Sequence, residues 1–207
     1  MSKTLLLIVT IAIAIVGFFT FRVIQDPSTI GLTADGQKKP DVQQVKGLAT
    51  AFDQWREFAA PSGHFKVLLP ALPQHATEKL RDPKTQEPRQ YDMYVSEEGN
   101  GTLFMISIIS IPDNKQQAID EGVLKTVMND MLKSTPNGKL KTMKIGNYKE
   151  FPSIDFAIEN DQVLIDGKVF LVQQTLYALT SVAKRDMFLS SEFDFFINSF
   201  QLLNNKE

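Results

Sequence analysis

His64 and His75 are the only imidazole side chains in this chain of 207 residues, and the chain contains no cysteine. Histidine is the most common catalytic base and metal ligand, so a hydrolytic relay or a zinc site would depend on one of these two residues. They are eleven positions apart, without helical i,i+4 spacing, and the nearest carboxylates are Glu78 and Asp82. The sequence therefore predicts surface histidines, no metal site and no cofactor.

The other residue types that carry chemistry are scattered as well. No Gly-x-Ser-x-Gly elbow is present, and no glycine-rich phosphate-binding loop precedes a helix. Glu97 and Glu98 fall in a predicted hairpin turn, and Asp155 and Glu159 share the polar face of a predicted strand. We predict no catalytic residue and a non-enzymatic protein. The alternative is a membrane-tethered hydrolase or ligand-binding enzyme that uses His64 or His75.

A basic segment follows in the second half of the chain. Lys139, Lys141, Lys144 and Lys149 occur within eleven residues that contain no acid. Lysines in this pattern can contact anionic lipid headgroups, and they also protect an edge strand against aggregation. The second interpretation is preferred, and the four lysines are the predicted surface contact. A net charge of −2 and a pI near 5.8 give no reason to expect nucleic acid as a partner.

The most apolar segment lies at the N-terminus. Seventeen uncharged residues, 5–21, stand between Lys3 and Arg22, and a helix of this length covers roughly 26 Å of a bilayer core of about 30 Å. We predict a short tail over 1–4 and a transmembrane anchor over 5–24, through which the chain contacts the lipid bilayer. The apolar positions of this anchor include Leu5, Ile8, Ile11, Ile15, Phe18 and Phe21.

Two questions about this segment stay open. The apolar run is long for a cleaved signal peptide, and it ends in Phe-Phe-Thr-Phe-Arg, which is a poor cleavage context; a secreted protein remains the alternative. Basic residues are almost balanced on the two sides, with Lys3 before the segment and Arg22, Lys38 and Lys39 after it. The short tail favours a single-pass membrane protein whose globular domain is extracytoplasmic, that is, periplasmic.

The remaining chain predicts a linker over 25–50, partly helical, and one globular domain over 51–207. Apolar residues recur every three or four positions from Val42 to Phe58 and favour a helix, although 54–59 could instead be a first strand. Residues 74–90 are polar and contain two prolines, which indicates a loop. A second helix is expected from Pro112 to just before Ser134, and a third is expected to be capped by Ser190 or Ser191.

Apolar and alternating segments predict the strands. They are expected over 64–69, 91–96, 102–111, 139–145, 153–160, 162–165 and 168–182, with Asp166-Gly167 as a tight turn between the last two. Strands joined by short hairpins, with helices covering them, indicate an α+β fold built on a mainly antiparallel sheet.

Three segments of the chain resemble PsbP-like domains. They are the run Trp55–Pro73 with its Gly-x-Phe-x-Val-x-x-Pro pattern, the hairpin through Lys168–Leu179, and Phe193–Phe200 with its Ser-Phe ending. The resemblance spans roughly residues 55–203. It implies the α/β/α sandwich that luminal PsbP proteins share with a Ran-binding import factor, and a non-enzymatic binding or assembly role. The expected function is a membrane-anchored module of the bacterial cell envelope that binds another envelope protein.

Overall fold

The computed structural model describes residues 52–81, 88–110 and 121–203, most of which lie in β-strands. Seven antiparallel strands form the larger sheet, in the spatial order β3-β4-β5-β9-β8-β7-β6. Their bounds are Gln74–Arg81 (β3), Pro88–Glu97 (β4), Leu103–Ser110 (β5), Lys139–Tyr148 (β6), Phe151–Glu159 (β7), Val163–Val172 (β8) and Thr175–Lys184 (β9). The sheet consists of two meanders that meet where β5 pairs with β9.

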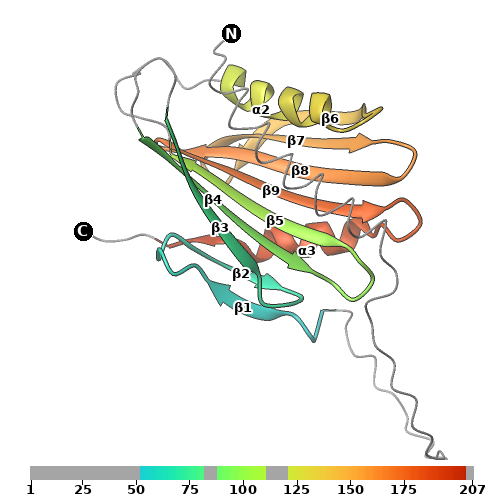
Figure 1. Ribbon diagram of the computed structural model, residues 1–207, viewed down its shortest axis with the longest axis horizontal. Helices are drawn as coiled ribbons and strands as arrows, with labels where there is room; N and C mark the ends of the chain where they lie inside the picture. Colours follow the sequence, from blue (N-terminus) through green and yellow to red (C-terminus); the bar gives the residue numbers. More distant parts are fainter. Residues whose placement is uncertain (1–51, 82–87, 111–120, 204–207) are drawn as a thin grey trace, which may run out of the picture.

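A smaller sheet and two helices complete the described fold. β1 (Arg56–Ala59) and β10 (Gln201–Leu202) pair with the two sides of β2 (Phe65–Leu69), and the helices are α2 (Glu121–Ser134) and α3 (Ser190–Ser199). Figure 1 shows α2 on one face of the larger sheet, and α3 with the smaller sheet on the other face. The predicted α+β fold, a mainly antiparallel sheet covered by helices, is confirmed for the described residues.

Two apolar cores separate these layers. On one face, Leu124 and Val127 of α2 pack against β7 and β8. On the other face, the fully buried rings of Phe65, Phe196 and Phe200 fill the space between the larger sheet and its cover. Burial of a large apolar side chain contributes about 1.5–3 kcal/mol, so these two cores supply most of the stabilisation of the fold.

Three hydrogen bonds fix the second cover. The Ser199 hydroxyl donates to the carbonyl of Phe196 (2.8 Å) and accepts from the backbone N–H of Leu68 (3.1 Å), which joins the end of α3 to β2. The buried Tyr148 hydroxyl donates to the carbonyl of Phe200 (2.7 Å) and so ties the end of β6 to the C-terminal strand. The serine of the Ser-Phe ending therefore has a packing role.

The loop expected over 74–90 is wrong where the structure describes it. Gln74–Arg81 form β3, which pairs with Pro88–Glu97 along its whole length. The β3 side chains from Gln74 to Lys79 are exposed or half-buried. An edge strand of this kind has no apolar face, so the alternation that marks a strand in the sequence is missing.

The tight turn expected at Asp166-Gly167 is also wrong. Both residues lie inside β8, and the chain reverses after Val172, where Gln173 adopts a positive φ of 53°. A Cβ on Gly167 would lie 2.2 Å from Cζ of Phe156, its register partner on β7. The glycine is required because a phenyl ring lies across the strand at this point.

Other expectations differ at the ends of elements. Residues 54–59 are expected from the sequence either to end a helix or to form a first strand. The strand is correct, because Arg56–Ala59 form β1. Leu189 occupies the N-cap position of α3, so neither Ser190 nor Ser191 caps it. The anchor predicted over 5–24 and the start of the helix expected from Pro112 lie outside the described residues. Among the helices within the described ranges, none is long and apolar enough to cross a membrane.

We expect Gly167→Ala to destabilise the protein by about 1–3 kcal/mol, because the added methyl group must displace the Phe156 ring. Urea unfolding followed by fluorescence will measure the change, since Trp55 is the only tryptophan and is buried.

Gly146→Ala is the matched control, because a Cβ at Gly146 of β6 meets no atom within 4 Å. The alanine at position 167 should also cost less in a Phe156→Leu background. An equal loss of stability at the two glycines would contradict the steric explanation.

Candidate functional site

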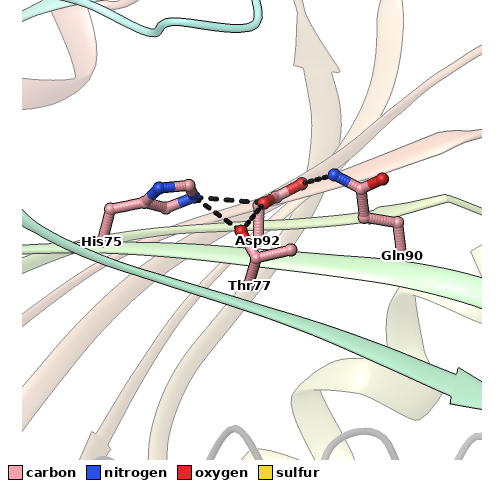
Figure 2. Close-up of polar contacts among 4 residues, drawn as sticks. All are labelled: His75, Thr77, Gln90 and Asp92. Atoms are coloured by element: carbon pink, nitrogen blue, oxygen red, sulfur yellow. Dashed lines mark hydrogen bonds and ion pairs between the residues drawn. The ribbon is translucent and has the colours of Figure 1, made fainter.

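A polar cluster lies on the outer end of the larger sheet, where β3 pairs with β4. Thr77 and Asp92 are register partners, and His75 and Gln90 flank them. Thr77 Oγ1 donates to Asp92 Oδ1 (2.6 Å), and Gln90 Nε2 donates to Oδ2 (2.8 Å). Figure 2 shows His75, Thr77 and Gln90 turned toward the Asp92 carboxylate.

The histidine in this cluster makes two contacts through one nitrogen. His75 Nε2 lies 3.1 Å from Asp92 Oδ1 and 3.1 Å from Thr77 Oγ1. The Thr77 hydrogen is directed to the carboxylate, so we assign the hydrogen on Nε2 to His75 and the acceptor roles to Asp92 and Thr77. A nucleophilic relay requires the hydroxyl to give its proton to imidazole while the acid holds the other nitrogen. This arrangement does not have that geometry.

The cluster rests on an aromatic layer. The His75 ring stacks on Tyr94 with centroids 4.2 Å apart, and Tyr94 packs edge-on against Phe65 of the second core. Burial raises the pKa of the Asp92 carboxyl, but hydrogen bonds from Thr77, Gln90 and His75 outweigh it and lower that pKa overall. The cluster is therefore a carboxylate stabilised by surrounding donors.

His64 and His75, the two histidines that a metal site would need, are positioned by different sheets of the fold. His64 precedes β2 in the smaller sheet, whereas His75 lies on the edge strand of the larger sheet. Glu78 is three positions from His75 on β3 and therefore points to the opposite face. Within the ranges that the structure describes, no group of three or more metal-ligating side chains is present. Asp82 lies outside them.

The predicted lysines lie on and beside the opposite edge strand. Lys139, Lys141 and Lys144 belong to β6, and Lys149 follows it in the turn to β7 with a positive φ of 56°. β6 is the last strand in the sheet order, which is the edge position that one of the two interpretations requires. The Lys149 ammonium lies 5.5 Å from the Tyr148 ring centroid, and Lys141 pairs with Glu159 of β7 (3.4 Å).

The other face of β6 carries an apolar surface that sequence reasoning missed. Leu140, Met143 and Ile145 are 39%, 44% and 41% exposed, and we call them the β6 apolar strip. Their register partners on β7 are buried beneath α2, and these are Ile158, Phe156 and Ile154. The alternation of lysine with Leu, Met and Ile gives a signal for this strip, but its exposure depends on where α2 lies.

A pair of acids joins α3 to the hairpin between β4 and β5. Glu192 is in the first turn of α3 and only 6% exposed. Burial, together with the charge of Glu98 and a hydrogen bond to it, raises the pKa of Glu192 to about 6. Paired carboxylates in glycosidases flank a substrate several ångströms wide. Glu98 and Glu192 contact each other instead, so they do not have the geometry of such a site.

A Ser-x-x-Lys spacing, which some serine hydrolases use for catalysis, occurs at Ser181-Val-Ala-Lys184. Residues three apart on a strand point to opposite faces, and both ends of this motif lie on β9. Ser181 is buried while Lys184 is exposed, so the lysine does not activate the serine.

The comparisons with known proteins identify the fold. No family model matches the chain, and no curated protein matches it. The chain is similar to the solution structure of cyanobacterial PsbP (CyanoP) from Synechocystis, with a TM-score of 0.52 and 14% sequence identity. The match covers 77% of this chain and 98% of that one. The PsbP-like resemblance of the sequence is thereby confirmed at the level of the fold.

Replacing Asp92 by Asn should lower the free energy of unfolding near neutral pH. The folded pKa of Asp92 lies below its usual value, so its contribution is complete above about pH 4 and is lost as the pH falls through the lowered pKa. The free energies of unfolding of the wild type and the variant should therefore become equal as the pH falls through the acid range. Thr77→Val removes the shortest hydrogen bond and should move this convergence to higher pH; an unchanged profile would contradict the assignment.

The effect of replacing Glu192 by Gln on stability should depend on pH in the opposite sense. The raised pKa means that Glu192 destabilises the fold as the pH rises through about 6, whereas below the usual glutamate pKa both states hold the proton. The variant should be more stable than the wild type near pH 8 and equally stable near pH 4, measured by thermal unfolding. Glu98→Gln removes only the contribution of the neighbouring charge and leaves Glu192 buried, so it should gain less than Glu192→Gln, and the double variant should gain no more than Glu192→Gln alone.

Proposed function

We propose that this protein is a membrane-tethered, non-enzymatic binding module of the bacterial cell envelope, and that it binds a partner protein at strand β6. The β6 apolar strip carries this proposal. It continues a core layer whose other members are buried, and it lies at an edge that no described segment covers. An apolar surface beside charged residues, left exposed next to a core, is typical of a protein interaction site.

The polar clusters of the described residues favour binding over catalysis. The Thr77 hydroxyl is bonded to Asp92, and Glu192 is buried against Glu98. Neither cluster leaves a nucleophile beside an imidazole that could accept its proton. The hydrolase alternative that uses His64 or His75 gains no support from this geometry.

The membrane tether is part of the proposal and rests on the apolar run at 5–24. An anchor confines the domain to the membrane surface, where the effective concentration of a membrane-bound partner is high. A weak contact at β6 is then sufficient for assembly. An extracytoplasmic domain follows from the short N-terminal tail, and a secreted protein with a cleaved first segment remains the alternative.

Photo-crosslinking in cells tests the proposed function. A benzoylphenylalanine residue introduced at Met143 should give a protein adduct under light, because Met143 lies in the β6 apolar strip. Met187 is the matched control, since it is a methionine of similar exposure (46% against 44%) in the turn before α3. Equal yields at the two positions, or no adduct at either, would contradict a partner site at β6.

Protease treatment of intact and opened spheroplasts tests the tether. Digestion of the domain in intact spheroplasts, with the chain in the membrane fraction, is the expected result. Protection of the domain until the spheroplasts are opened would show that it lies on the cytoplasmic side. A shortened soluble form would show that the first segment is cleaved.

A further inference from the structure

The backbone of β6 defines how a partner would bind. Among the described strands, β6 has only β7 as a neighbour, and its other side presents a row of backbone N–H and C=O groups. We infer that β6 binds an extended, acidic segment of a partner protein, which adds to the sheet as an extra strand. This inference rests on the proposed function and specifies the chemistry of the partner.

The two faces of β6 present different side chains to such a strand. The β6 apolar strip lies on the α2 side, opposite Ile158, Phe156 and Ile154 of β7. Lys139 and Lys144 lie on the other side, opposite Glu159 and Asp155. A segment that alternates apolar residues with Asp or Glu would match both faces at once, because cross-strand neighbours of opposite charge or of apolar type stabilise a sheet.

The acids of β7 are already engaged by other cations. Glu159 contacts Lys141 (3.4 Å) and Arg185 (3.7 Å), and Asp155 pairs with Lys168. Within the described part of the chain, Lys139 and Lys144 form no ion pair. The outer edge of the sheet is consequently basic on this face, and it attracts carboxylates from a partner.

The strand is also regular over the length that an added strand needs. Its one register shift falls between Leu140 and Thr142, and Thr142–Tyr148 then continue without interruption. Gly146 leaves open space above the backbone on the lysine face, which admits a large side chain from an added strand.

Two other occupants fit the edge less well. A second copy pairing through β6 would bring lysines close to lysines, which opposes association. A lipid bilayer would attract the lysines, but an edge strand entering the hydrocarbon would carry its unpaired backbone groups with it, at several kcal/mol per group. Only an added polypeptide strand satisfies the backbone, the apolar strip and the lysines together.

A synthetic peptide tests this inference. The probe is fluorescent Glu-Val-Glu-Val-Thr-Val-Glu-Val-Glu, titrated with the full chain in a mild detergent. We expect saturable binding that weakens with salt, and chemical-shift changes confined to β6 and its neighbours. The Lys139→Glu/Lys144→Glu variant should bind about tenfold more weakly, since two favourable cross-strand pairs become unfavourable. The same peptide with lysine in place of glutamate should show the reverse preference.

Two controls separate strand addition from simple charge attraction. Lys79→Glu lies on β3, the opposite edge of the same sheet, and should leave binding unchanged. N-methylation of one alternate set of peptide amides should abolish binding, and methylation of the other set should not, because only one set faces β6. Equal effects of the two methylated peptides would overturn strand addition.

The remaining outcomes also decide between the hypotheses. Chemical-shift changes at β6 on addition of vesicles of phosphatidylcholine and phosphatidylglycerol, lost in the lysine variant, would assign β6 to the membrane and overturn the inference. An adduct at Met143 in cells without peptide binding would overturn the acidic-strand inference and keep the proposed function. Absence of both would overturn the two together.

Discussion

Both faces of the larger sheet must be kept from water, and the rest of the structure depends on this constraint. β5 shows it most clearly: Leu103 and Met105 belong to one core, while Phe104 and Ile106 belong to the other. A sheet that is apolar on two sides needs two covers. The chain supplies α2 for one face, and it supplies α3 with the smaller sheet for the other.

The second cover explains why the two ends of the described chain meet. β10 pairs with β2, and the buried Tyr148 hydroxyl bonds the carbonyl of Phe200. The PsbP-like fold is therefore closed by segments that are far apart in sequence. The same contacts hold the end of β6 in place, so the proposed binding edge is positioned by the C-terminal part of the core.

Much of this fold follows from the sequence, and the exceptions have physical causes. Central strands such as β5 are apolar along their length and were predictable, as was the edge position of the lysine-rich segment. β3 was missed because its exposed side chains give no alternation. Gly167 was misinterpreted because a glycine required by a neighbouring ring looks like a glycine required by a turn. The exposure of the β6 apolar strip depends on the placement of α2, which no local pattern encodes.

The two edges of the sheet differ in whether their exposed side chains already have partners, and this difference points to function. Where β3 pairs with β4, polar side chains bond one another, as Asp92 does with Thr77 and Gln90, so the side chains at that edge already have partners. At β6, the strip is half exposed and the neighbouring acids are paired with other cations. A partner gains little by covering groups that are already bonded, because it must replace interactions of equal strength. It gains most where apolar surface, backbone groups and uncompensated charge coincide, and in the described sheet that combination is found along β6.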